Sequence, residues 1–276
     1  MKKMKWMLPL LAVLGVASAC APKPVAPKVL VLYYSQSNTT QKVAEEIAGR
    51  LGADVEAVVP VKPYDGTYQE TIERCLQERE SGVLPEVKPI QADLAAYDVI
   101  FLGYPIWFGT CALPFLSVLD QIDLSGKKVV PFCTFGSGGL ISSVKDLAEK
   151  QPEAEILPGY GVRSARIDAA PQEIDRFLKA GGFIEGEFFQ PEPFPATHPV
   201  SEAEAALFDE AVGNYPMIHA RATDVTSRTL PEGTEYLFTA VDQPRDDNPQ
   251  PEPPIPFHIF VLATEGQAPV FTQVVR

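Results

Sequence analysis

A cluster of small polar side chains follows the first strongly apolar stretch of the sequence. It reads Ser-Gln-Ser-Asn-Thr-Thr from residue 35 to residue 40 and leads directly into an amphipathic stretch. Backbone N–H groups at the beginning of a helix bind anions, and neighbouring hydroxyls add donors. The chain has neither the G-x-x-x-x-G-K-[ST] motif of nucleotide triphosphatases nor the G-x-G-x-x-G motif of dinucleotide-binding folds. The segment is therefore a candidate phosphate site; the alternative is a hydroxyl-rich helix cap without a ligand.

A second segment, residues 104–111, carries two adjacent aromatic residues, Trp107 and Phe108. Adjacent aromatic rings in a loop beside a glycine are costly in water, so they pack inward or stack on a planar ligand. The alternative is that both rings belong to the hydrophobic core, and the core is favoured for Phe108 more than for Trp107.

A third segment, residues 134–139, has glycine at three of its last four positions. Glycine lets the backbone approach a ligand closely, as the edge of a planar ring requires. The alternative is a flexible turn. Residues 104–111 and 132–144 contain no charged side chain, which suits a neutral planar heterocycle.

Other residues capable of chemistry form no convincing site. The four cysteines lack C-x-x-C spacing and the three histidines are far apart in the sequence, so no metal site is predicted. A serine hydrolase is disfavoured because the chain lacks G-x-S-x-G. Cys111 and Cys133 flank the second and third segments, but buried cysteines usually act as small apolar side chains. No residue is assigned a catalytic role.

The three segments lie in a part of the chain where strands and helices alternate. Such alternation is typical of a doubly wound α/β fold, in which ligands bind beyond the carboxyl ends of parallel strands. The pattern predicts strands over residues 29–34, 54–61, 98–104, 128–133 and 155–162, and helices over residues 39–51, 67–80, 112–122, 140–150 and 171–180.

A different pattern follows this region. Residues 183–200 are predicted to form a linker whose aromatic residues pack against the protein, and not a free tether. Residues 201–276 begin with a capping box, Ser201 to Glu204, and predict one helix followed by consecutive strands. This order indicates a small α+β domain with an antiparallel sheet, analogous in element order to cystatin-like folds. The expected strands span residues 217–225, 234–241, 257–263 and 269–275, with a proline-rich, extended loop over residues 246–256.

The N-terminus predicts export. Residues 1–19 combine three early lysines, an apolar run and small residues before Cys20. The apolar run is shorter than the about 20 residues needed to cross a bilayer. The segment resembles a bacterial lipoprotein signal, which implies lipidation of Cys20 and a tether over residues 20–28. The expected location is the cell envelope, on a periplasm-facing inner or outer membrane, with the lipid as the only membrane contact. The alternative is an ordinary secretory signal with an incidental Cys20.

Composition excludes several classes of protein. The chain has 276 residues, 46% of them hydrophobic and 21% charged, which excludes long disorder and a polytopic membrane protein. Its formal net charge of -13 repels phosphate backbones, so no nucleic-acid partner is expected.

Residues 29–182 resemble the flavodoxins, particularly a flavodoxin-like branch common in bacteria. Residues 35–40 match its S-x-[ST]-[GN]-x-T phosphate loop, and residues 104–109 match its Y-P-I-W-[WF]-G loop. Pro63-Tyr64 match a turn after the second strand, and residues 134–139 match its Gly/Ser-rich loop. The resemblance implies a five-stranded parallel sheet of order 2-1-3-4-5 that binds FMN. The residues implied to bind it are Ser35, Ser37, Asn38, Thr39, Thr40, Pro105, Ile106, Trp107, Phe108, Gly109, Thr110, Thr134, Phe135, Gly136, Ser137 and Gly138.

The resemblance implies roles for these residues. Trp107 would stack on the flavin, Phe135 is the one candidate for stacking from the third loop, and no basic residue in the loops compensates an anionic reduced flavin. The expected function is electron transfer or flavin oxidoreduction by an FMN-binding lipoprotein, with a redox partner protein or a small-molecule electron acceptor. The alternative is a non-catalytic envelope binding or scaffold module that has lost its flavin. We expect residues 201–276 to dock partners, so that deleting them leaves FMN affinity nearly unchanged.

Overall fold

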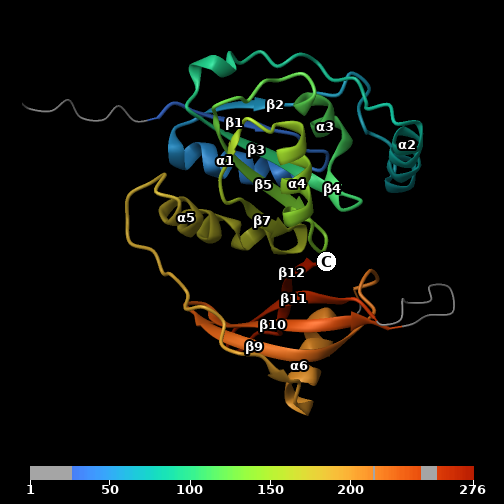
Figure 1. Cartoon of the computed structure of the whole chain (residues 1–276), viewed down its shortest axis with the longest axis vertical. Coiled ribbons are helices and arrows are strands. Elements are labelled where there is room, and N and C mark those ends of the chain that lie inside the picture. The colour runs from blue at the N-terminus through green and yellow to red at the C-terminus, as the bar shows by residue number, and fades with distance from the viewer. Residues whose placement is uncertain (1–26, 214, 244–253) are drawn as a thin grey trace, which may run out of the picture.

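The computed structural model describes residues 27–213, 215–243 and 254–276, and it forms an α/β domain and a smaller sheet domain (Figure 1). The predicted export signal, Cys20 and most of the tether lie outside the described residues, as does most of the proline-rich loop 246–256. Among the helices of the described ranges, none is both long and apolar enough to cross a bilayer.

The first domain is built on a parallel sheet. Its strands run in the order β2-β1-β3-β5-β6, and β7 also pairs with β5, so that β6 and β7 together form the last edge of the sheet. This confirms the predicted doubly wound sheet of order 2-1-3-4-5. The strands are β1 (Val29–Tyr33), β2 (Asp54–Ala57), β3 (Val99–Trp107), β5 (Lys128–Phe135), β6 (Glu155–Ile156) and β7 (Tyr160–Arg163).

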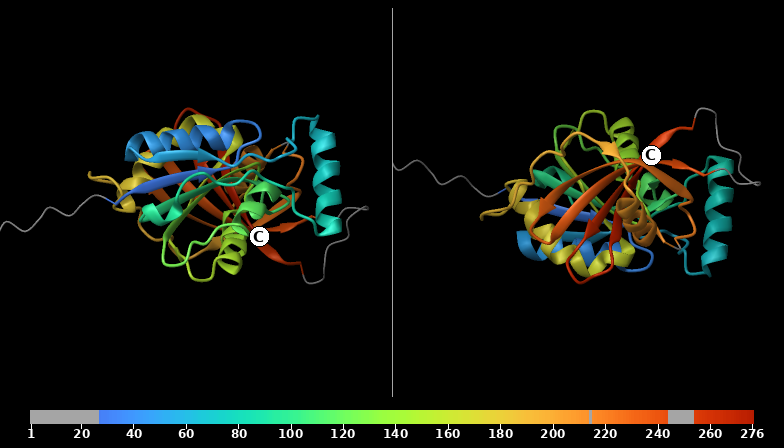
Figure 2. Two further views of the ribbon diagram at one scale, coloured as in Figure 1. Left: turned by 90° about the horizontal axis from the view of Figure 1, so that it is seen from above. Right: turned by 90° about the horizontal axis from the view of Figure 1, so that it is seen from below.

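Helices cover both faces of this sheet. α1 (Thr39–Leu51) and α5 (Ala170–Ala180) bury Ile47 and Ile174 against one face, and α3 (Leu113–Leu119) and α4 (Leu140–Lys150) bury Phe115 and Leu147 against the other. Because successive side chains of a strand point to opposite faces, both faces need apolar residues. All five residues of β1 are accordingly buried. α2 (Tyr68–Ser81) stands to one side of the sheet (Figure 2) and buries only Thr71 and Cys75.

Several predicted boundaries are wrong. The strand predicted over residues 54–61 ends at Ala57, and the helix predicted over 112–122 ends at Leu119. The strand predicted over 155–162 is interrupted after Ile156. Pro158 has no N–H to donate to a ladder, and a Cβ at Gly159 would lie 2.7 Å from the carbonyl oxygen of Pro131. Single-turn helices at Leu94–Ala96 (η1) and Ser164–Ala169 (η2) complete the domain.

The second domain is an antiparallel sheet with one helix, as predicted. α6 (Glu202–Val212) begins at the Ser201–Glu204 capping box, and its Phe208 packs edge-on against Phe238 with ring centroids 5.0 Å apart. The strand order is β12-β11-β10-β9-β8. The strands are β8 (His198–Pro199), β9 (Ala220–Leu230), β10 (Gly233–Asp242), β11 (Pro256–Ala263) and β12 (Val270–Val275).

The linker between the domains packs only part of its aromatic residues. Phe183 lies 5.1 Å from Phe101 and Phe194 lies 6.1 Å from Phe260, both measured between ring centroids. Phe188 and Phe189 are exposed. The linker thus follows the surface of both domains while two of its rings stay in solvent.

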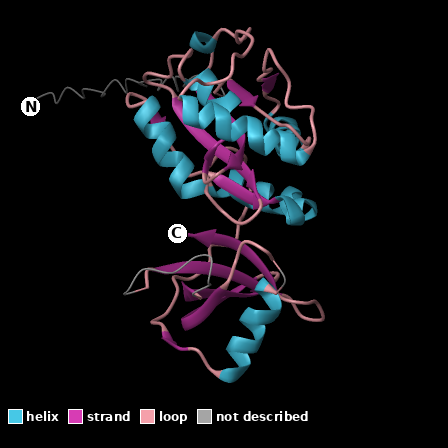
Figure 3. Cartoon of the chain, turned by 90° about the vertical axis from the view of Figure 1, so that its right-hand side faces the viewer, coloured by secondary structure: helices cyan, strands magenta, loops and turns pink. Residues whose placement is uncertain are grey.

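The edge strand β12 lies next to the α/β domain (Figures 1 and 3). The Val274 N–H donates to the Ser137 carbonyl at 2.7 Å, and Gly138 forms an isolated parallel bridge with Val274. An exposed edge strand offers unpaired backbone groups. Here the loop after β5 covers part of that edge.

Candidate functional site

The loop between β1 and α1 presents an open helix N-terminus. Asn38 adopts a left-handed conformation, with φ 63°, and its side chain does not cap α1. The first intrahelical bond runs from the Lys42 N–H to the Asn38 carbonyl, so the N–H groups of residues 39–41 remain outside the helical ladder. Such a terminus attracts anions through its free donors and the helix dipole.

Ser35 provides an independent observation at the same loop. Its Oγ is the one buried side-chain oxygen or nitrogen without a hydrogen-bond partner among the described residues. An unsatisfied buried hydroxyl costs about 1–3 kcal/mol, so its presence calls for an explanation. A phosphate group at the open N-terminus of α1 would accept a hydrogen bond from this hydroxyl. The residues therefore fit an anionic ligand.

Two of the predicted threonines contact each other. Thr40 and Thr134 are both buried, and their hydroxyls hydrogen-bond to each other at 2.8 Å. This bond ties α1 to β5 and uses the proton of one of the two hydroxyls. Ser37 and Thr39 remain available, since their hydroxyls lie 3.3 Å apart at the surface.

The aromatic loop is a tight hairpin. β4 (Thr110–Cys111) pairs back onto the end of β3, with Trp107 opposite Thr110. The two residues at the tip, Phe108 and Gly109, have φ of 51° and 82°. Two-residue hairpins favour turns in which both residues have positive φ, because their twist matches that of the strands. Phe108 is unusual at such a position, which normally favours small or polar residues.

The hairpin decides where the two rings lie. Trp107 is partly buried and packs edge-on against Tyr34 and Tyr64, with ring centroids 5.7 and 5.2 Å away. Phe108 is 48% exposed, and the guanidinium of Arg79 lies 5.0 Å from its ring centroid. The alternative that placed Phe108 in the core is therefore wrong, because the turn directs its side chain outward, and Phe108 stays available as the predicted site residue.

The third loop differs from its prediction in two respects. Phe135 is 2% exposed and belongs to the core, so it is not available to stack on a ligand. A Cβ at Gly136 would lie 2.6 Å from the Tyr215 hydroxyl, and one at Gly138 would lie 2.0 Å from the Val274 carbonyl oxygen. Glycine is therefore required at these two positions because the C-terminal domain lies close to the backbone of the loop.

The aromatic and third loops open onto one cavity of about 510 Å³. It is lined by Ile106 to Gly109 and by Gly136 to Gly139. The α2 residues Tyr68 and Ile72 form another side, and Gln36 of the phosphate loop reaches it. Gln36 donates to the Tyr64 carbonyl at 3.0 Å and to the Thr71 hydroxyl at 3.1 Å, which links the phosphate loop to α2.

Residues of the C-terminal domain complete this cavity, and sequence reasoning missed them. They are Tyr215, Met217, Val274 and Arg276. No motif could have identified them, because they belong to the cavity only through the docking of β12. Several predicted site residues do not line this cavity: Ser35, Ser37, Asn38, Thr39 and Thr40 of the first loop, and Pro105, Thr110, Thr134 and Phe135 of the other two. Thr110 instead donates a short hydrogen bond to Asp146.

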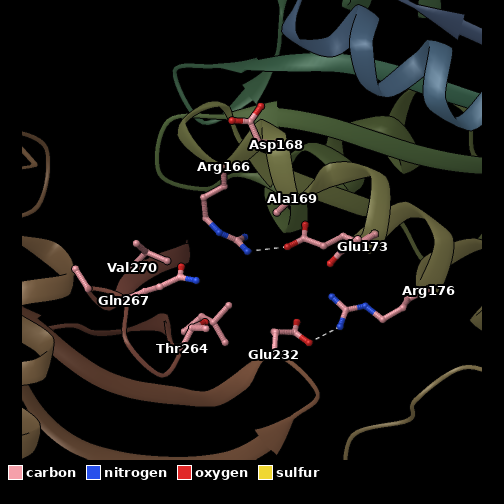
Figure 4. Close-up of a pocket in the computed structure, with 12 residues that line it drawn as sticks. Arg166, Asp168, Ala169, Glu173, Arg176, Glu232, Thr264, Gln267 and Val270 are labelled. Carbon is pink, nitrogen blue, oxygen red and sulfur yellow. Dashed lines mark hydrogen bonds and ion pairs between the residues drawn. The ribbon is translucent and has the colours of Figure 1, made fainter.

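A second groove, of about 420 Å³, lies between the domains (Figure 4). Four of its charged side chains pair with one another, and the fifth, Asp168, has no ion-pair partner among the described residues. Arg166 contacts Glu173 at 2.7 Å within the first domain, and Arg176 contacts Glu232 across the domain boundary at 2.5 Å. The groove is therefore best explained as an electrostatic contact between the domains.

The three cysteines that the structure describes are buried thiols. Cys75, Cys111 and Cys133 are free and buried. Burial raises the pKa of the Cys111 thiol to about 12 and that of Cys75 to about 11, so both stay protonated at neutral pH. Within the described residues, no group of histidine, cysteine or carboxylate side chains could hold a metal ion.

Comparison with known proteins decides the family. The model of the family described as flavodoxin matches residues 28–173, just over half of the chain. The chain belongs to the flavodoxin family. The match ends before the antiparallel sheet, so the C-terminal domain lies outside it.

Several known proteins are similar to part of the chain. An NAD(P)H dehydrogenase (quinone) of Gluconacetobacter diazotrophicus is 36% identical over 94 residues, which are 34% of this chain and 46% of that protein. The chain thus spans about half the length of this curated relative. A putative flavoprotein of Bacteroides uniformis is 26% identical, covering 55% of this chain and 99% of its own, with a TM-score of 0.49. A flavoprotein of Lactobacillus acidophilus, solved in complex with FMN, is 28% identical, covering 52% and 97%, with a TM-score of 0.45.

Proposed function

We propose that the protein binds FMN at this site and acts in electron transfer or as a flavin oxidoreductase. The observation that carries the proposal is the unpartnered, buried Ser35 hydroxyl beside the open N-terminus of α1. A scaffold module that has lost its ligand gains nothing from an unsatisfied hydroxyl. Membership of the flavodoxin family supports the same ligand.

The chain's residues would hold the cofactor by its two ends. Ser35, Ser37 and the N–H groups of residues 39–41 are the donors available to the phosphate. Trp107 and the backbone of residues 136–138 lie in the adjoining cavity, which suits a flat ring. FMN itself supplies the electron chemistry, and the protein supplies orientation and electrostatics.

The direct experiment is a titration of FMN and riboflavin with the purified, flavin-free protein, followed by quenching of flavin fluorescence. We expect FMN to bind more tightly than riboflavin, because only FMN carries the phosphate. Absence of quenching by either compound would refute the proposal. Equal affinities would show that the loop after β1 does not hold a phosphate.

We also propose that the protein is anchored in the cell envelope through a lipid on Cys20, with a redox protein or a small molecule as its electron acceptor. The sequence of residues 1–20 supports the anchor. Labelling of expressing bacteria with a radioactive fatty acid tests it. We expect label in the wild-type protein and none in Cys20→Ala, whereas an unlabelled wild-type protein would contradict the anchor.

A further inference from the structure

The C-terminal domain places apolar side chains at the candidate cofactor cavity. Tyr215 and Met217, which follow α6, both line it. Met217 is 72% exposed, and on the same cavity Tyr68 is 83% and Phe108 48% exposed. Grouped exposed apolar side chains usually mark a binding site. Residues from both domains therefore contribute to one apolar surface.

Defined contacts hold this arrangement in place. The backbone of Val274 bonds to the third loop at Ser137, and the Tyr215 ring packs edge-on against Phe271 with centroids 5.2 Å apart. Arg163 donates to the carbonyls of Gly136 and Phe271, each at 2.8 Å. Ser137 and Gly138 thus contact Val274 directly, and Gly136 is joined to the C-terminal domain through Arg163, which also bonds to Phe271.

The third loop contributes no aromatic ring to the cavity. Phe135 is buried in the core, and the residues that follow it in the cavity are Gly136, Ser137, Gly138 and Gly139. A flat aromatic ligand is bound most strongly by aromatic or thioether groups on its surface. Among the lining residues, such groups come from Tyr68, Trp107 and Phe108 in the first domain, and the C-terminal domain adds Tyr215 and Met217.

We propose that the C-terminal domain is a wall of the FMN site, and that Tyr215 and Met217 contact the flavin ring directly. The inference rests on the FMN binding proposed above. It replaces the expectation that residues 201–276 form a separate docking domain whose removal leaves FMN affinity unchanged. The same side chains then also limit which acceptors reach the flavin.

The test uses the full chain with Tyr215→Ala, Met217→Ala and a matched control, Tyr236→Ala. Tyr236 belongs to the same domain and stacks on Phe238 at 5.9 Å, but it does not line the cavity. We expect FMN to bind roughly 3- to 10-fold more weakly to Tyr215→Ala, the scale of one aromatic contact. Because Met217 is exposed, we expect Met217→Ala to leave the fold intact, so that a change in FMN affinity reports on the lost contact.

A second measurement is quenching of the bound flavin by iodide. Loss of the wall should make the flavin more accessible to iodide in Tyr215→Ala and Met217→Ala, while Tyr236→Ala behaves like the wild type. Wild-type affinity and accessibility in both cavity variants would overturn the inference and leave FMN binding intact. A wild-type protein that binds no FMN would overturn the proposed function and this inference together.

Discussion

The guanidinium of Arg163 lies flat against the ring of Phe271, with Cζ 3.4 Å from the ring centroid. Arg163 ends β7 of the flavodoxin domain, and Phe271 belongs to β12. The side chain is 8% exposed, and burial lowers its pKa to about 10, so it remains charged at neutral pH. No carboxylate pairs with it among the described residues. The three loops lack basic residues, but the buried Arg163 guanidinium hydrogen-bonds to the Gly136 carbonyl of the third loop.

Replacing Arg163 should loosen the domain contact. Arg163→Ala removes two charge-assisted hydrogen bonds and the contact with Phe271, which we expect to lower the free energy of unfolding by about 2–4 kcal/mol. Urea unfolding followed by circular dichroism measures this. Arg221→Ala, at an exposed position of β9, is the control and should change stability by less than about 0.5 kcal/mol. A loss for Arg163→Ala no larger than that of the control would show that the contact contributes nothing.

Gly138 should not tolerate a side chain. In Gly138→Ala the new Cβ would meet the Val274 carbonyl oxygen at 2.0 Å, so the loop or β12 must move. We expect a loss of roughly 1–3 kcal/mol in unfolding free energy and weaker FMN binding. The control is Gly49→Ala in α1, where no atom lies within 4 Å, and it should be neutral or stabilising because alanine favours helix. Equal stability of the two variants would contradict the bridge between Gly138 and Val274.

Ser35→Ala should affect stability and binding in opposite directions. Without ligand, the variant loses a buried hydroxyl that has no partner, so it should be as stable as the wild type or more stable by about 1 kcal/mol. With FMN, it loses a hydrogen bond to a charged phosphate and should bind about 10-fold more weakly. Riboflavin affinity should not change. A parallel loss for both flavins would place Ser35 away from the phosphate.

Trp107→Ala distinguishes a flavin site from a structural cluster. The variant loses edge-on contacts with Tyr34 and Tyr64, so some loss of stability is expected in either case. If Trp107 also contacts the flavin, FMN binding should weaken by ~1–2 kcal/mol, measured by fluorescence titration at a temperature where the variant is fully folded. Unchanged FMN affinity would restrict Trp107 to packing.

Acid should weaken the contact between the domains. Burial disfavours the Glu232 carboxylate, but the hydrogen bond and charge of Arg176 outweigh it and lower its pKa below the ordinary value of 4.5. The Arg176–Glu232 pair therefore stabilises the fold at pH values above 4.5, and its contribution is lost as the pH falls through the lowered pKa of Glu232. Arg176→Gln should cost about 0.5–1 kcal/mol at pH 7, and the difference from wild type should shrink below about pH 4. A difference independent of pH would exclude the ion pair as its cause.

Much of the fold could be predicted because it depends on local patterns. β1 reads as a continuous apolar run because helices cover it on both sides, and α1 shows its buried face through Val43 and Ile47. The three loop positions were predicted from the rule that ligands bind at the carboxyl ends of parallel strands. The antiparallel sheet followed from one helix and a series of strands.

The remaining features depend on contacts between distant residues or on backbone geometry. The hydrogen bond between Thr40 and Thr134 joins two of the loops through residues 94 positions apart in the sequence. The outward position of Phe108 depends on a turn with positive φ, which is rare for an aromatic residue. The contribution of Tyr215 to the cavity depends on where β12 docks. None of these features leaves a periodic pattern in the sequence.

The residues that support the third loop are far apart in the sequence, and this separation sets the order in which the site forms. Arg163 and Phe271 are 108 residues apart. Domains form in order from the N-terminus as the chain is made, so the parallel sheet can assemble before β12 exists. The loop from Gly136 to Gly138 then reaches its final conformation only when β12 has docked. If FMN binds as proposed, its complete site exists only after this last strand has docked, and a chain truncated before β12 would form the parallel sheet without that wall of the cavity.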